Sequence, residues 1–256
     1  AAAAQATEFA GGRPVIPAPI DTPTFADVDL VVETITEDLT TKHELFRRIE
    51  PWCHPKAVIA TNTSSLTIGG IASSLKMPER FAGLHFLKPG HLTGVVEIIP
   101  GPKTSETTTQ VLRDVARQMG KAPLVAQRDV PGFIWNRIQF AVLRECLHML
   151  ESGVASAADI DTAVSDGLAP RWTAAGPLAT ADLGGLATFT KICDLLFPHL
   201  AAESSAPDAI REPAERGEAL QEWTRVNPDA VAALRATALA NGRTLAALRR
   251  SLGNDA

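Results

Sequence analysis

The chain of 256 residues contains no tyrosine, only three cysteines and no apolar run long enough to cross a membrane. A membrane-spanning helix needs about 20 consecutive apolar residues, so we expect a soluble protein. Cys53, Cys146 and Cys193 are odd in number and widely spaced, which excludes a disulfide framework and favours a reducing, cytoplasmic location. Cys53 precedes His54, but no second pair of ligands lies nearby, so no metal site is expected.

The chain also lacks a large excess of either charge, since it has 24 basic and 29 acidic residues and a net charge of only −5. The basic residues are scattered, with the nearest approach to a cluster at Arg243, Arg249 and Arg250. We therefore expect no nucleic-acid partner and no membrane partner. The N-terminus lacks the features of a signal peptide, and the first methionine is Met77. These features predict a processed product or a fragment.

Residues up to 129 alternate between strand and helix signals, and 45% apolar content is enough for a sizeable core. Residues 1–22, rich in Ala, Gly and Pro, predict an irregular segment. Helices are expected at 39–52, 66–75 and 105–119, with a Thr cap on the first and Thr104 or Ser105 on the third. Apolar, β-branched runs predict strands at 28–35, 57–63, 81–86, 95–99 and 123–127. The alternation is typical of parallel βαβ units, which predicts an α/β domain over 23–129.

After Pro131 the pattern becomes helical. An Asn cap and a proline at the first helical position open a helix at 227–240, and 201–219 is loop-like or weakly helical. Other helices are expected at 133–153, 156–167 and within 176–196. We therefore predict an all-helical domain over 130–256.

His85 and Glu97 lie within two strand-like segments separated by a loop with Pro89, Gly90 and Gly94. A lone histidine in such a segment is most often buried and hydrogen-bonded. A carboxylate beside it adds a second interpretation, because it fixes the tautomer and leaves the other ring nitrogen free to accept a proton. The two strands are able to place these side chains together as a general base and its orienting group.

Ser64 follows a strand directly, in "TNTSS", and Asn136 interrupts an apolar helical turn in "PGFIWNR". Ser64 is either a turn or cap residue or a substrate contact at the carboxyl end of a parallel strand, where ligands bind. Asn136 either caps the junction between the domains or reaches into a cleft.

Five motifs occur in the order and near the spacing of the 3-hydroxyacyl-CoA dehydrogenase family, which this sequence resembles from about residue 25 to residue 200. They are "DLVVETITEDLTTKHELF", "ATNTSSL", "RFAGLHFLKP", "VVEII" and "PGFIWNR". The resemblance implies a Rossmann-type parallel-sheet domain, a helical domain like that of 6-phosphogluconate dehydrogenase, and oxidation of a 3-hydroxy group with NAD as cofactor. It also implies a homodimer formed through the helical domain.

The resemblance also implies roles for individual residues. His85 corresponds to the catalytic base and Glu97 to its partner, while Ser64 and Asn136 correspond to residues that hold the reacting oxygen of the substrate. The residues implied to contact NAD are Glu37, Lys42, Asn62, Ser64 and Lys88.

The sequence departs from the family pattern at several positions. Lys88 replaces an Asn near the cofactor and substrate, and the tail signature with its tyrosine survives only as "ALQEWT". Residues 167–185 resemble relatives acting on small free acids such as L-gulonate or carnitine. Arg171 in this stretch either pairs with a substrate carboxylate or is a solvated surface residue.

The largest departure is the absence of any G-x-G among the 18 glycines. The family places the cofactor pyrophosphate on such a turn, so we expect the front half of the nucleotide domain to be missing and an apolar sheet edge to be exposed. Two interpretations follow: part of a dehydrogenase of 3-hydroxyacyl-CoA or free 3-hydroxy acids, or an inactive remnant that serves as a dimerisation module.

Overall fold

The computed structural model describes residues 23–221, 224 and 228–251, so the segment 1–22 predicted to be irregular lies outside the described residues. The chain divides into two compact units. We call Ala1–Leu87 with Val95–Trp135 the sheet unit, and Lys88–Gly94 with Asn136–Ala256 the helical unit. The fold is therefore α/β followed by all-α, as the sequence predicted.

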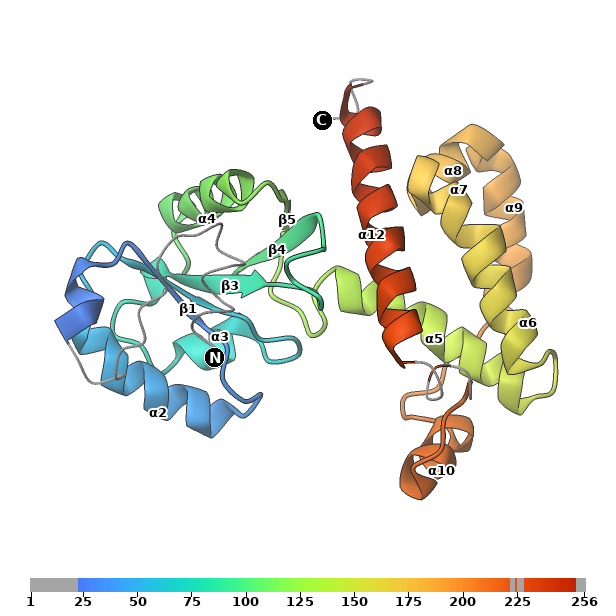
Figure 1. Ribbon diagram of the computed structural model, residues 1–256, viewed down its shortest axis with the longest axis horizontal. Helices are drawn as coiled ribbons and strands as arrows, with labels where there is room; N and C mark the ends of the chain where they lie inside the picture. Colours follow the sequence, from blue (N-terminus) through green and yellow to red (C-terminus); the bar gives the residue numbers. More distant parts are fainter. Residues whose placement is uncertain (1–22, 222–223, 225–227, 252–256) are drawn as a thin grey trace. The chain divides into compact units, whose positions relative to one another are not determined.

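The sheet contains five strands that neighbour one another in chain order (Figure 1). They are β1 (Leu30–Glu33), β2 (Val58–Thr61), β3 (Phe81–His85), β4 (Val95–Pro100) and β5 (Ala122–Val125). All pairings are parallel except β3 with β4, which is antiparallel. The predicted parallel-sheet domain is confirmed as a mainly parallel sheet; β3 and β4 differ because the short connection after His85 is not the crossover helix that a parallel neighbour requires.

Helices lie on both faces of the sheet: α2 (Leu39–Ile49) and α3 (Ile68–Ala72) on one, and α4 (Glu106–Gln118) on the other (Figure 1). Short 3₁₀ turns complete the unit at Pro23–Asp27, Glu50–Trp52 and Pro78–Arg80.

Polar side chains set where these helices begin. Ser105 caps α4, as predicted. The cap of α2 is Asp38 and not a threonine, because its carboxylate accepts the N–H of Thr41. Helix α3, which was predicted over 66–75, begins later because Thr67 takes the N-cap with extended backbone dihedrals, and it ends at Ala72.

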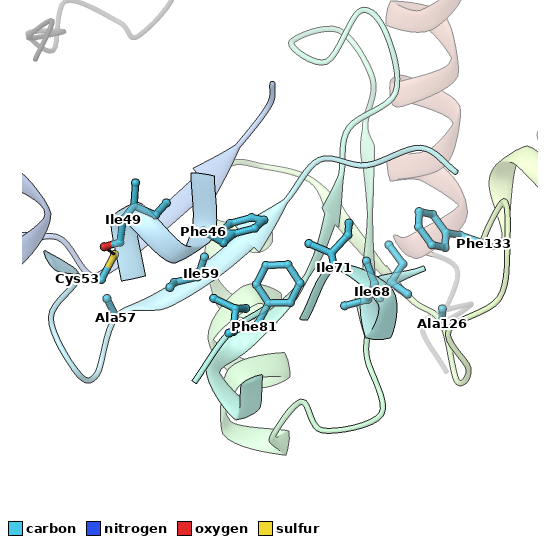
Figure 2. Packing of buried hydrophobic residues seen from close by; sticks show 12 residues of the cluster. Phe46, Ile49, Cys53, Ala57, Ile59, Ile68, Ile71, Phe81, Ala126 and Phe133 are labelled. Carbon is cyan, nitrogen blue, oxygen red and sulfur yellow. Dashed lines mark hydrogen bonds between the residues drawn. The ribbon is translucent and has the colours of Figure 1, made fainter. Parts of the chain in front are cut away.

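Alternate residues of each strand pack on opposite faces, as expected for a sheet covered on both sides. Ile59, Phe81 and Ile99 pack with residues of α2 and α3 in the cluster shown in Figure 2. The cluster on the α4 face contains Val58, Ala60, Ala82, Leu84, Val96, Ile98, Leu112 and Ala116. By this alternation His85 and Glu97 face α2 and α3, on the same side as Phe81 and Ile99.

Gly83 allows α3 to approach the sheet closely. A Cβ at this position would lie 2.8 Å from Ile68 Cδ1 and 3.1 Å from Ile99 Cβ. Because Gly83 is two residues before His85 on the same face, this close contact lies beside the site described below.

The helical unit contains α5 to α10 and α12, and no strand occurs in the described residues after 130. Three of the predicted helical ranges change. A left-handed Gly185 divides 176–196 into α8 and α9, and 201–219 contains α10. The final helix runs beyond residue 240; its predicted cap, Asn227, is outside the described residues. The bounds are α5 (Trp135–Glu151), α6 (Ala157–Thr162), α7 (Ala169–Ala174), α8 (Pro177–Gly184), α9 (Leu186–Leu196), α10 (Asp208–Arg216) and α12 (Pro228–Ser251), with a π-helical turn at Ala163–Leu168 and a 3₁₀ turn at Phe197–His199.

No helix within the described part of the chain has both the length and the apolar character needed to cross a membrane.

Phe81→Ala tests the packing on the α2 face. Phe81 is completely buried and meets Phe46 edge to face, with ring centroids 5.1 Å apart. We expect the free energy of unfolding to fall by about 3–5 kcal/mol, because truncating a buried aromatic ring loses its transfer free energy and leaves a cavity. Urea denaturation measures this, with exposed Met119→Ala as control, expected within about 0.5 kcal/mol of the unaltered chain. Equal losses for the two variants would contradict this packing.

Candidate functional site

His85 and Glu97 are register partners on β3 and β4, and their side chains meet as the sequence predicted. His85 Nδ1 lies 2.6 Å from Glu97 Oε2, and both side chains are almost completely buried. The antiparallel pairing places them directly opposite each other, since paired residues project to the same face. A carboxylate at this distance fixes a proton on Nδ1 and makes Nε2 the acceptor nitrogen of the neutral ring.

Glu97 uses its second oxygen as well. Oε1 accepts the backbone N–H groups of Ile134, at 2.9 Å, and Trp135, at 2.8 Å, where α5 begins. Burial acts to raise the pKa of Glu97, but the hydrogen bonds from His85, Trp135 and Ile134 outweigh it and hold the pKa below its usual value. Glu97 is therefore a carboxylate at neutral pH and keeps its negative charge against the imidazole.

Ser64 reaches the other nitrogen of the same ring. Its Oγ lies 3.1 Å from His85 Nε2. Since Nδ1 carries a proton toward Glu97, the serine hydroxyl donates to Nε2. The three side chains form one hydrogen-bonded series, Glu97–His85–Ser64, at the carboxyl ends of β2 and β3, where ligands bind in open sheets of this kind.

Phe133 covers the histidine ring and was given no role from the sequence. Its ring lies edge-on to His85 with centroids 5.7 Å apart, and its side chain is buried. Phe133 has a φ of 51°, in the left-handed region that non-glycine residues rarely adopt. The signal that was present is the "PGF" turn, in which Gly132 also has a positive φ.

Glu37 organises the loop that carries Ser64. Its Oε1 accepts hydrogen bonds from Thr63 Oγ1 (2.6 Å), Ser64 N (2.8 Å), Ser65 N (2.8 Å) and Ser65 Oγ (3.0 Å). Partial burial acts to raise the pKa of Glu37, but the bonds from Thr63, Ser65 and Ser64 together lower it to about 2.

Lys42 is completely buried, and its ammonium is paired with acidic groups. Its Nζ lies 2.8 and 2.9 Å from the two oxygens of Glu33 and 3.6 Å from Glu37 Oε2. Thr61 Oγ1 donates to the same Glu33 carboxylate at 2.6 Å. Glu33 and Thr61 were not among the predicted site residues; the signal in the sequence is an acidic residue, Glu33, at the end of the apolar run of β1.

Asn62 joins the ends of two strands. Its Oδ1 accepts the N–H of Phe86 at 2.7 Å, so the residue after β2 is tied to the residue after His85. This bond orders the edge on which Ser64 and His85 lie.

Three predicted site residues, Lys88, Asn136 and Arg171, belong to the helical unit. The Lys88 carbonyl accepts from Arg235 at 2.6 Å, Asn136 is the second residue of α5, and Arg171 is exposed on α7. Their roles stay predictions. Within residues 23–221, 224 and 228–251, no three His, Cys, Asp or Glu side chains gather as metal ligands.

Two family models match the chain over most of its length. The model described as "3-hydroxyacyl-CoA dehydrogenase, NAD binding domain" covers residues 7–130. The model described as "3-hydroxyacyl-CoA dehydrogenase, C-terminal domain" covers residues 132–227. The expectation that the front half of the nucleotide domain is missing finds no confirmation here and stays a prediction.

Curated relatives agree with this match. The chain is 33% identical over 184 residues to 5-formyl-3-hydroxy-2-methylpyridine 4-carboxylate 5-dehydrogenase of Mesorhizobium japonicum, covering 72% of this chain and 60% of the relative. It is 42% identical over 166 residues to the mitochondrial hydroxyacyl-coenzyme A dehydrogenase of Homo sapiens, covering 65% of this chain and 52% of the relative. The match thus spans about half to three fifths of the length of these relatives.

A solved structure extends the similarity to the fold. The crystal structure of a 5-formyl-3-hydroxy-2-methylpyridine 4-carboxylic acid 5-dehydrogenase, described as an NAD⁺-dependent dismutase, has a TM-score of 0.77 and 31% identity. The similarity covers 90% of this chain and 74% of that one. NAD is the cofactor that these matches indicate. The chain belongs to the 3-hydroxyacyl-CoA dehydrogenase family, whose members are NAD-binding oxidoreductases.

Proposed function

We propose that the Glu97–His85–Ser64 series is the catalytic centre of an NAD-dependent dehydrogenase that oxidises a 3-hydroxy group to a 3-oxo group. The observation that carries the proposal is the use of both ring nitrogens of His85. Nδ1 is held by a carboxylate at 2.6 Å and Nε2 by a serine hydroxyl at 3.1 Å. A buried base oriented in this way is prepared to accept one proton, at Nε2.

His85 Nε2 takes the proton of the substrate hydroxyl, and the imidazolium that forms is stabilised by the adjacent Glu97 carboxylate. Bound NAD supplies the acceptor for the hydride that leaves C3, so that the C3–O bond becomes a double bond. Once the substrate hydroxyl takes the place of Ser64 at Nε2, the Ser64 hydroxyl donates to the reacting oxygen, and Asn136 is a second proposed contact to that oxygen. In the reverse direction His85 returns the proton.

The carboxyl ends of β2 and β3 suit the nicotinamide part of NAD, because they present hydrogen-bonding groups on Asn62 and Ser64. Lys88 is a proposed contact in the helical unit. The Lys42 ammonium is buried against two carboxylates, whereas the Glu37 side chain is partly exposed. We propose that both residues support the loop that carries Ser64, and their direct contact with NAD stays a prediction.

Two substrate classes are considered. The human relative is named for hydroxyacyl-coenzyme A, and the Mesorhizobium relative for a small pyridine carboxylate whose reacting position 5 carries a formyl group, so its name supports a small free acid and not a 3-hydroxy group as the reacting group. We favour an acyl-CoA substrate, with a free 3-hydroxy acid as the second candidate. In the second case Arg171 would pair with the substrate carboxylate.

His85→Gln tests the base. We expect kcat for NAD-dependent oxidation of 3-hydroxybutyryl-CoA, followed as NADH absorbance, to fall about 10³-fold, because general-base catalysis contributes of that order. His43→Gln is the matched control, since this histidine contacts the Gly70 carbonyl and lies outside the series. The control is expected to keep kcat within about twofold. Full activity in His85→Gln, or no turnover by the unaltered chain, would contradict the proposal.

NADH binding separates the dehydrogenase from an inactive dimerisation module. We expect nicotinamide fluorescence to increase on titration of this chain, with an affinity weakened in Asn62→Ala, because that change releases the bond between the ends of β2 and β3. Arg171→Ala, in the helical unit, is expected to leave NADH affinity unchanged. No fluorescence change at millimolar NADH would favour the inactive module.

We also propose that the chain forms a homodimer through α8 and α9, where large apolar side chains are exposed. Leu178 and Leu183 are 84% and 83% exposed, and Leu186 and Leu195 are also largely exposed. Exposed apolar area of this kind marks association surfaces.

Leu183→Lys is expected to shift the chain from dimer to monomer in sedimentation velocity at micromolar concentration, since a charge at an apolar interface is costly. Met119→Lys, an exposed position on the sheet unit, is the control and should leave the dimer intact. A monomeric unaltered chain would contradict the proposal.

A further inference from the structure

The segment after β2 is held by one oxygen atom. Four hydrogen bonds from Thr63, Ser64 and Ser65 converge on Glu37 Oε1, at 2.6 to 3.0 Å. Two of them come from consecutive backbone N–H groups, which determine the path of the chain and not only the position of a side chain. Such charge-assisted bonds are about twice as strong as bonds between neutral groups.

Glu37 is itself held in place by the start of α2 and by Lys42. It precedes Asp38, the cap residue of α2, and its Oε2 lies 3.6 Å from the buried ammonium of Lys42. That ammonium is fixed by both oxygens of Glu33 at the end of β1. These contacts fix the position of the loop relative to β1 and α2, which pack on the core.

The same loop delivers Ser64 to His85. The contact of 3.1 Å between Ser64 Oγ and His85 Nε2 is within hydrogen-bond range, but a shift of about 1 Å would break it. Errors of this size are enough to cost about 100-fold in rate.

Oε1, the Glu37 oxygen that faces the loop, has little capacity to accept a further hydrogen bond. A carboxylate offers about four acceptor positions over two oxygens, and Oε1 alone already accepts four bonds. Its remaining oxygen faces Lys42. The influence of Glu37 on the reaction thus passes through the backbone of the loop.

We infer that Glu37 is a positioning residue, whose carboxylate holds the Thr63–Ser65 loop so that the Ser64 hydroxyl meets His85 Nε2. The inference rests on the proposed function for what those two groups do. The lowered pKa of Glu37 is consistent with this inference, because the Glu37 carboxylate then stays ionised at neutral pH.

The experiment is a double-mutant cycle of Glu37→Ala and Ser64→Ala, read first from the ¹⁵N chemical shifts of the His85 ring. If Glu37 acts through Ser64, both single variants shift the Nε2 signal in the same direction and by similar amounts. The double variant then shifts it no further, because coupled residues are not additive. We also expect amide exchange at Ser64 and Ser65 to be faster in Glu37→Ala.

Glu50→Ala is the matched control for general damage to the fold. Glu50 is also a buried carboxylate that accepts backbone N–H groups, from Lys76 and Met77, but this loop precedes the other end of β3. Glu37→Gln keeps an acceptor oxygen and loses the charge, so we expect a smaller shift of the His85 Nε2 signal than in Glu37→Ala. This variant replaces Glu37→Ala if the alanine variant does not fold. An unchanged His85 signal in Glu37→Gln and Glu37→Ala, or the same change in Glu50→Ala, would overturn the inference.

A kinetic cycle with 3-hydroxybutyryl-CoA keeps the two proposals apart. We expect Glu37→Ala to lower kcat about 10- to 100-fold in the unaltered background and less than about twofold when Ser64 is already alanine. If the losses of kcat in the two single variants were additive, the positioning role would be contradicted, but the proposed function would not be. Full activity in His85→Gln would contradict the proposed function, while the spectroscopic cycle would still decide the position of the loop.

Discussion

The structure of the site depends on the buried carboxylate of Glu97. One oxygen orients the imidazole of His85, and the other holds the first backbone N–H groups of α5. A buried carboxylate is tolerated only when its charge and its acceptor positions are satisfied. The histidine and the start of the helix satisfy this carboxylate together, so its removal would disturb both the orientation of His85 and the start of α5.

A second set of buried charges lies at the ends of β1 and β2. Glu33, Lys42 and Thr61 form a compact hydrogen-bonded group, and Glu37 extends it toward the loop that carries Ser64. Bringing an ammonium and a carboxylate out of water is costly, and such a pair rarely adds much stability compared with apolar packing. Its value here is geometric, since it links helix α2, which packs on the core, to the loop that carries Ser64.

The two units contribute different things to the proposed reaction. The sheet unit holds the proposed base His85, the Glu97 carboxylate and Ser64 in one hydrogen-bonded series. The helical unit carries Asn136, Lys88 and Arg171, together with the exposed leucines of α8 and α9. Chemistry is thus assigned to the sheet unit, whereas substrate selection and association are proposed for the helical unit.

The order of strands and helices, the change to helix after Pro131 and the contact of His85 with Glu97 could be predicted from the amino-acid sequence. These features depend on residues near one another in the chain: periodic apolar positions, and a short loop between two strands. The antiparallel pairing of β3 with β4, the burial of Lys42 and the packing of Phe133 against the His85 ring depend on tertiary contacts. A lysine on a helix has the same local pattern whether it points to water or to a buried glutamate, because that choice is made by which distant segments pack against it.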